Sequence, residues 1–166
     1  LHWADCQIVF GRTTSPETPY ERLRSHGVTV LGNEPITSNA IGFVGIDDAD
    51  DKQQVGKQLA GIERAKDTFP VLLYHRPDDF ESAAEHGFDL MLAGHTHNGQ
   101  IAPFNYLVKK RFPQIAGLYE QGNSRLYVFT GTGTWGPPLR LGSVNEIAVF
   151  DLAPTEIDGP SKGPQS

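Results

Sequence analysis

Short runs of apolar and β-branched residues alternate along the chain with stretches in which apolar residues recur at helical spacing. A short apolar run between turn residues is typical of a strand, and a helical spacing is typical of an amphipathic helix. The pattern predicts strands at 6–11, 28–31, 40–46, 70–75, 89–94, 125–133 and 145–152, and helices at 15–27, 50–66 and 77–87. Strands that alternate with helices, followed by late strands without them, favour a layered α/β fold.

The composition is that of a globular protein with a sizeable core. The chain has 166 residues, of which 38% are hydrophobic, and this length suits one domain. The formal net charge is −6 and no face is rich in Lys and Arg, which disfavours a nucleic-acid binder held by bulk charge. Cys6 is the single cysteine, so an internal disulfide and a cysteine-based zinc site are excluded.

The two ends of the chain differ in character from its middle. We expect residues 1–152 to form the domain and the polar residues 153–166, rich in Pro and Gly, to form a disordered tail. The chain starts at Leu1 and its only methionine is Met91, so we expect the gene product to extend upstream.

Histidines follow two of the predicted strands. His75 ends one apolar run, His95 comes directly after another, and His97 lies two residues further on, between Gly94 and Gly99. Active sites of open α/β sheets lie at the carboxyl ends of the strands, so we expect these side chains to converge. Neutral imidazole is a common ligand of zinc, manganese and iron. The alternative, that these are surface or core-edge histidines without a special role, is less favoured for this spacing.

Three further features have a functional and a structural interpretation. The acidic stretch at 47–51 can hold magnesium or calcium, but it more often charges the start of a helix. The basic stretch 108–112 can meet an anionic substrate or a membrane surface, or form a solvated face. Arg140 can contact a phosphate or pair with Glu146, and Trp135 can line a cleft or cover the core.

The segments "LYHRPDDF", "LAGHTHNGQI" and "GTGTWGPPLRLG" followed by "NEI" resemble the C-terminal half of the calcineurin-like metallophosphoesterases. The resemblance is strongest to the bacterial phosphodiesterase branch, in which Gly-His-Thr-His is followed by Gly-Gly-Gln. Asn98 replaces the first of those glycines here. Together with "GVTVLGNEPI" and "IGFVGIDDADD", the resemblance covers about residues 27–152.

The resemblance implies a four-layer α/β/β/α sandwich with two divalent metal ions, of Mn, Zn or Fe, at the strand ends. His75 and His95 would bind one ion and His97 the other. The implied reaction is hydrolysis of a phosphodiester by a metal-activated water. The substrate would be a small-molecule phosphate ester or a lipid-like one, and the location is open between the bacterial cytoplasm and a membrane reached through an upstream segment.

The family motifs of the first half do not appear in this sequence. Asp-x-His, Gly-Asp-x-x-Asp and Gly-Asn-His-Glu/Asp are absent, and "GNE" at 32–34 lacks the histidine. We therefore expect a fold without its N-terminal half and little or no turnover by this chain alone. The missing half, or self-association, would cover the apolar surface left open. The alternatives are a degenerate domain of the same fold that serves binding or protein interaction, and a lone structural zinc.

Overall fold

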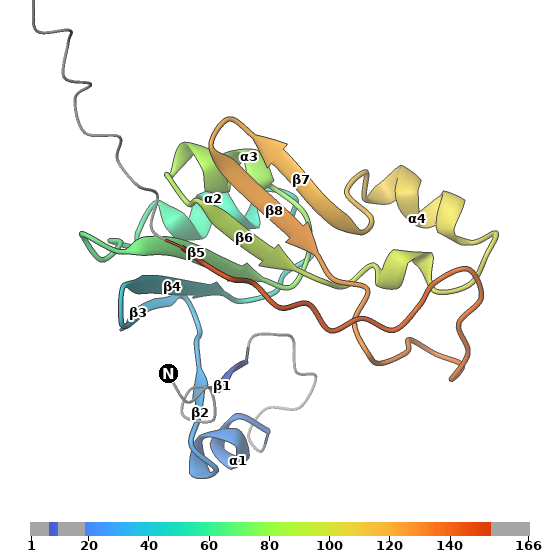
Figure 1. Ribbon diagram of the computed structural model, residues 1–166, viewed down its shortest axis with the longest axis horizontal. Helices are drawn as coiled ribbons and strands as arrows, with labels where there is room; N and C mark the ends of the chain where they lie inside the picture. The colour runs from blue at the N-terminus through green and yellow to red at the C-terminus, as the bar shows by residue number, and fades with distance from the viewer. Residues whose placement is uncertain (1–6, 10–18, 154–166) are drawn as a thin grey trace, which may run out of the picture.

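The computed structural model describes residues 7–9 and 19–153, and a six-stranded sheet is its central element (Figure 1). In spatial order the sheet consists of β3 (Glu34–Ser38), β4 (Ile41–Ile46), β5 (Phe69–Tyr74), β6 (Leu90–Ala93), β8 (Ser124–Val128) and β7 (Gly117–Gln121). A separate parallel pair is formed by β1 (Gln7–Val9) and β2 (Val28–Val30), which α1 (Pro19–Ser25) connects. The other helices are α2 (Gln54–Leu59), α3 (Phe80–Glu85), the short 3-10 helix η1 (His97–Gly99) and α4 (Asn105–Arg111).

The central strands β4, β5, β6 and β8 are all parallel, whereas β3 and β7 pair with their neighbours antiparallel at the two edges. Parallel neighbours need crossover connections, and α2 and α3 provide them between β4 and β5 and between β5 and β6. The carboxyl ends of these strands therefore meet at one edge of the sheet, and the segments that follow them are brought together there.

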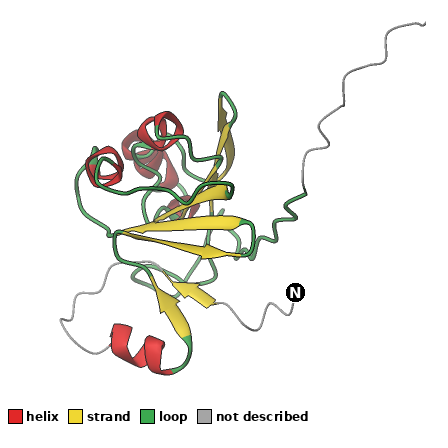
Figure 2. Ribbon diagram, turned by 90° about the vertical axis from the view of Figure 1, so that its left-hand side faces the viewer, coloured by secondary structure: helices red, strands yellow, loops and turns green. Residues whose placement is uncertain are grey.

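One face of the sheet packs against α2 and α3 and forms the main core. Alternate residues of the strands point to this face, among them Leu72, Met91 and Leu126, and all three are fully buried. The helices contribute Val55 and Phe80 to the same cluster. Figure 2 shows these helices together on one side of the sheet. The α/β class predicted from the sequence is confirmed.

The opposite face of the sheet is less completely buried. Leu31, Val71 and Leu73 are buried there, but several neighbouring apolar side chains are only half-buried. The C-terminal segment 143–152 runs along this side (Figure 1), where Phe150 contacts the ring of Tyr127 with centroids 5.2 Å apart.

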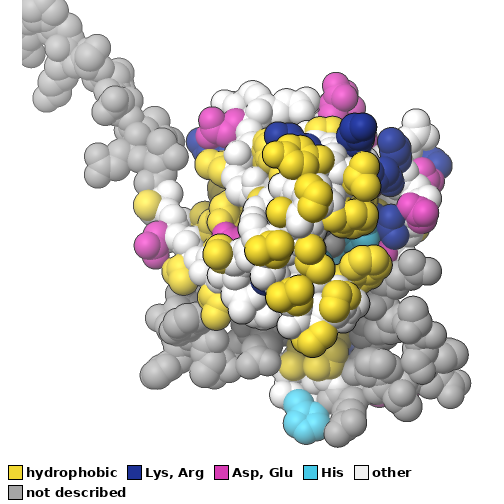
Figure 3. All heavy atoms as spheres, turned by 90° about the vertical axis from the view of Figure 1, so that its right-hand side faces the viewer, with side chains coloured by type: hydrophobic (Ala, Val, Ile, Leu, Met, Phe, Trp, Pro, Cys, Tyr) yellow, Lys and Arg dark blue, Asp and Glu magenta, His cyan; other side chains and the backbone are white. Residues whose placement is uncertain are grey.

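Apolar side chains are also exposed at the end of the molecule that carries α4. Figure 3 shows them gathered across that face. They belong to α4 with the residue before it and to the segment 135–141: Phe104, Tyr106, Leu107, Trp135, Leu139 and Leu141. None of the helices in the described ranges is long and apolar enough to cross a membrane.

Most predicted elements are confirmed, with shorter bounds. The strands predicted at 28–31, 40–46, 70–75 and 89–94 are β2, β4, β5 and β6, and the helix predicted at 77–87 is α3. β8 occupies only the first part of 125–133. The predicted elements at 6–11 and 15–27 are seen as β1 and α1. Residues 6, 10–11 and 15–18 of these predictions lie outside the described residues, as does the tail 154–166, whereas residues 26–27 form a turn after α1.

The helix predicted at 50–66 is wrong in extent, because α2 begins only at Gln54 and ends at Leu59. The aspartates before it were expected to charge its first turn, yet that turn contains no acidic residue. Asp48 and Asp50 instead bind Arg76, which holds the chain before α2 in a loop.

The strand predicted at 145–152 is wrong, and β3, β7 and α4 were missed. β3 and β7 are edge strands with mixed polarity, and α4 has no buried residue, so none carries a clear periodic signal. The segment 145–152 has the alternation of a strand, but no described strand lies beside it to share backbone hydrogen bonds. Its Ile147 is 84% exposed.

Hydrogen exchange tests this arrangement. The amides of 147–152 should exchange as fast as those of an unstructured peptide, because no described acceptor bonds them. The amides of Leu126 and Val128 in the sheet should be protected in the same experiment. Slow exchange across 147–152 would show that this segment is a paired strand in solution, as the sequence pattern alone suggested.

Candidate functional site

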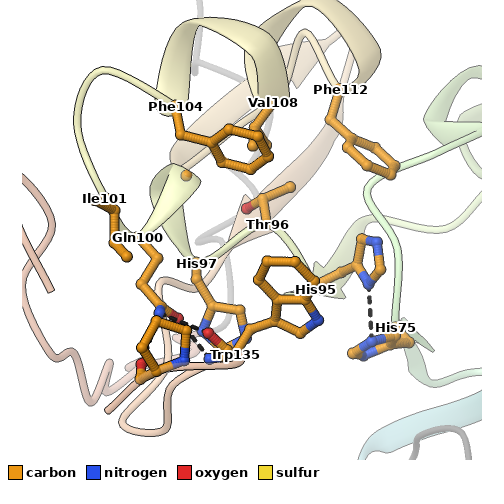
Figure 4. Close-up of a pocket in the computed structure, with 12 residues that line it drawn as sticks. His75, His95, Thr96, His97, Gln100, Ile101, Phe104, Val108, Phe112 and Trp135 are labelled. Carbon is orange, nitrogen blue, oxygen red and sulfur yellow. Dashed lines mark hydrogen bonds between the residues drawn. The ribbon is translucent and has the colours of Figure 1, made fainter. Parts of the chain in front are cut away.

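His75 and His95 meet at the carboxyl edge of the sheet (Figure 4). β5 and β6 are parallel neighbours in which Leu73 pairs with Leu92, so the residues that follow them emerge side by side. Nδ1 of His95 lies 3.1 Å from Nε2 of His75, and the two rings are edge to face with centroids 4.9 Å apart. These two side chains converge as their places at the strand ends predicted.

His97 belongs to the same cavity but points elsewhere. Its Nδ1 lies 3.2 Å from the carbonyl oxygen of Thr130 and 3.3 Å from a guanidinium nitrogen of Arg140. In Figure 4 it lies apart from the other two rings. Within residues 7–9 and 19–153, no three His, Cys, Asp or Glu side chains are grouped closely enough to hold a metal. The chain therefore presents a pair of histidines with a third at a distance.

The environment keeps the histidine pair neutral. Burial is the main cause that lowers the pKa of His95, to about 4, and repulsion from His75 and Arg76 adds to it. Burial also lowers the pKa of His75, although the charge of Asp48 opposes this shift. Neutral imidazole is the form that binds metals, so the pair fits two ligand positions of a borderline divalent ion. It does not supply the carboxylates that a dinuclear site needs.

The backbone around these histidines is strained. Several residues that are not glycine have a positive φ: His95 (68°), His97 (49°), Asn98 (52°) and Gln100 (52°). Each such residue costs of order 1 kcal/mol, and strain of this kind gathers at functional loops. The bend that was expected at Gly94 and Gly99 is made by Gly99, with a φ of 73°, and by His95 itself.

A cavity of about 620 Å³ opens beside the histidines. His75, His95 and His97 form its polar end, and the backbone of 94–100 lies below it. The apolar part of the lining, here called the apolar wall, is made of Ile101, Phe104, Val108, Phe112, Trp135 and Pro137. A volume of this size suits a small-molecule ligand. Trp135, for which two positions were considered, therefore lines the cavity, and it is 69% exposed.

Relatives named as metallophosphoesterases share most of this chain. A protein of Helicobacter pylori strain J99 is 39% identical over 140 residues, which cover 80% of this chain and 37% of that protein. A protein of Campylobacter jejuni is 37% identical over 136 residues, which cover 78% of this chain and 36% of the relative. The chain belongs to the metallophosphoesterase family. It spans little more than a third of the length of these relatives.

A further relative carries the family in its name. A protein of Danio rerio, named as a transmembrane protein with a metallophosphoesterase domain, is 32% identical over 153 residues, 81% of this chain and 35% of its own length. No protein-family model matches the chain. No solved structure matches it either.

Two polar side chains tie the histidine loop of this metallophosphoesterase chain to its surroundings. The buried amide of Gln100 accepts a hydrogen bond from the backbone N–H of Trp135 and donates to the carbonyl of the same residue at 2.7 Å. The hydroxyl of Thr96 donates to the carbonyl of Ile115. Both residues lie in the histidine motif, but only the structure reveals these contacts.

Arg140 lies next to His97 and acts as a clamp on the neighbouring loop. Its guanidinium donates to the carbonyl oxygens of Thr130 at 2.9 Å and Gly131 at 3.1 Å. The alternative pairing with Glu146 is wrong, because that carboxylate accepts from the backbone N–H of Thr130 at 2.8 Å instead. A contact between Arg140 and substrate stays a prediction.

A buried ion pair lies directly after His75. Arg76 bonds Asp48 at 2.7 Å and Asp50 at 2.7 Å, and the side chain of Asp48 is only 1% exposed. These carboxylates therefore neutralise an arginine, and the structure gives no support to their interpretation as a magnesium or calcium cluster. The pair fixes the loop after β4 against the end of β5, and sequence reasoning missed it.

Gly99→Ala should destabilise the protein by about 2–4 kcal/mol. Gly99 has a φ of 73°, and a Cβ there would lie 2.3 Å from Cα of Asn105, a backbone atom that moves only if α4 moves. Gly94→Ala is the matched control, because a Cβ at that position meets nothing within 4 Å. Its effect should stay within about 1 kcal/mol. Urea unfolding followed by circular dichroism measures both, and equal stability of the two variants would contradict the tight contact of η1 with α4.

Proposed function

We propose that this chain supplies the histidine half of the active site of a metal-dependent phosphoesterase that hydrolyses phosphodiesters. The observation that carries the proposal is the 3.1 Å approach of two neutral histidines at the carboxyl ends of β5 and β6. His75 and His95 would hold one divalent ion of Mn, Zn or Fe, and His97 would contribute to a second. Family membership supports divalent metal use in general.

The chain's own residues define what this half can do. When bound, divalent ions polarise a phosphoryl group and make water a better nucleophile. His75 and His95 offer lone pairs without first losing a proton, because burial keeps them neutral. The positive charge of Arg140 beside His97 would favour an anionic substrate, and its contact with phosphate is part of the proposal.

The carboxylates that would balance two dications have no candidate among the described residues near the histidines. Asp48 and Asp50 are engaged by Arg76, and Asp78 accepts from Arg111 at 3.1 Å. We place the remaining ligands outside these 166 residues, consistent with relatives of which the chain covers 37% and 36%. Whole-enzyme turnover would then require that further sequence.

Metal titration of the 166-residue chain tests the histidine pair. His95→Ala and His75→Ala should each weaken Mn²⁺ or Zn²⁺ binding, measured by calorimetry, by at least about 10–100-fold, the range found when only an outer partner of a ligand is removed. His86→Ala is the control, because His86 directly follows α3 and bonds the carbonyl of Ser82. Equal loss in all three variants would mean that the effect is not specific to the site.

The same chain should hydrolyse bis-para-nitrophenyl phosphate very slowly even with Mn²⁺ present. The motif Gly-Asn-His-Glu/Asp, which carries the family's catalytic histidine, does not occur in the sequence, and a general acid contributes about 10²–10⁴ in rate. Robust Mn²⁺-dependent turnover that His95→Ala abolishes would show that the chain needs no further ligands.

A further inference from the structure

The lining of the cavity beside the histidines divides into a polar part and an apolar part. The polar part is confined to His75 and the histidine loop, and the rest of the lining is the apolar wall of Ile101, Phe104, Val108, Phe112, Trp135 and Pro137. Figure 4 shows Phe104, Val108 and Phe112 along one side of α4, above the histidine loop. A ligand with its phosphate at His75 and His95 would therefore extend along hydrocarbon and aromatic surface.

The polar side chains that line the cavity are already engaged. The Gln100 amide is used on both of its atoms by the backbone of Trp135 and Pro137, and the Thr96 hydroxyl donates to Ile115. Recognition of a nucleobase or a sugar needs free donors and acceptors. Because these side chains are engaged within the protein, the lining favours a hydrocarbon group over a nucleoside.

The outer surface of α4 carries the same two features, apolar area and positive charge. Tyr106 is 70% exposed and Leu107 is 57% exposed. Lys109 and Lys110 follow them and have no ion-pair partner within the described ranges, although the chain as a whole is acidic. Figure 3 shows the apolar side chains at the centre of this face, with basic side chains along its edge and histidine visible beside them. Positive charge on this surface of α4 favours an anionic partner.

We propose that the cavity takes the hydrocarbon part of an amphiphilic phosphate ester. The ester's phosphate lies at the histidines, and its alkyl or aryl chain lies against the apolar wall. The inference rests on the proposed function, because the same histidines and their metal hold the phosphate. Either a dissolved amphiphile or a lipid at a membrane surface has this chemistry.

Binding of n-alkyl phosphates to the Mn²⁺-loaded chain tests the proposal. The series runs from methyl through butyl and hexyl to octyl phosphate, each below its micelle concentration, and calorimetry gives the affinities. Affinity should rise about fourfold for each methylene that the apolar wall buries. Octyl glucoside, which has the chain but no phosphate, should bind far more weakly than octyl phosphate.

Matched variants on α4 locate the alkyl chain. Val108→Asp places a charge in the apolar wall and should abolish the increase with chain length, while methyl phosphate binds as before. Leu107→Asp, one residue away and outside the wall, should leave the whole series unchanged. Phe104→Ala is a second wall variant at a side chain that is 47% exposed, so it serves if Val108→Asp fails to fold.

The outcomes separate this inference from the proposed function. If methyl phosphate does not bind in a way that depends on Mn²⁺ and His95, the proposed function fails. If methyl phosphate does bind with this dependence on Mn²⁺ and His95, but affinity does not increase with the length of the alkyl chain, only the amphiphile inference fails. Vesicles of phosphatidylcholine with phosphatidic acid distinguish the sources: a lipid substrate binds there and competes with octyl phosphate. Vesicle binding without any binding of octyl phosphate would mean surface adsorption and would overturn the inference.

Discussion

The parallel pairing of β5 with β6 is the constraint on which the site depends. Two neighbouring strands with the same direction end at the same edge, and each is followed within two residues by a histidine. α3 makes this pairing available as a crossover, and the packing of Leu72 and Met91 against the helices holds it in register. A slip of one residue would send these side chains to the opposite face and move His75 away from His95.

The loop around the histidines is held in a costly conformation by contacts on several sides. Gln100 binds the backbone of the segment that contains Trp135, and Gly99 lies against the start of α4. Arg140 donates hydrogen bonds to carbonyl groups of the neighbouring loop, and Arg76 holds the end of β5 through its ion pair with Asp48. These contacts can maintain residues with positive φ that an isolated peptide would avoid.

The strand-end histidines could be predicted from the sequence, because apolar runs identify buried strands and the position of a residue after a strand is local information. The direction of His97 could not, because it depends on the φ angles of the residues from His95 to Asn98. The pairing of Arg76 with Asp48 joins positions far apart in sequence and gives no periodic signal. In the segment 145–152 the sequence pattern predicts a strand that is not formed. The alternation is that of a strand, but a strand also needs a neighbouring strand to pair with its backbone.

The central claim is that His75 and His95 are a pair of neutral metal ligands. The most direct measurement is heteronuclear NMR of the chain with labelled histidine rings, during titration with diamagnetic Zn²⁺. The ring nitrogens that face each other, Nε2 of His75 and Nδ1 of His95, should shift together and saturate at the same zinc concentration. The ring of His86, which directly follows α3, should not shift. If the two facing nitrogens stay unchanged, or shift at different zinc concentrations, the pair is not a metal site and the account is contradicted.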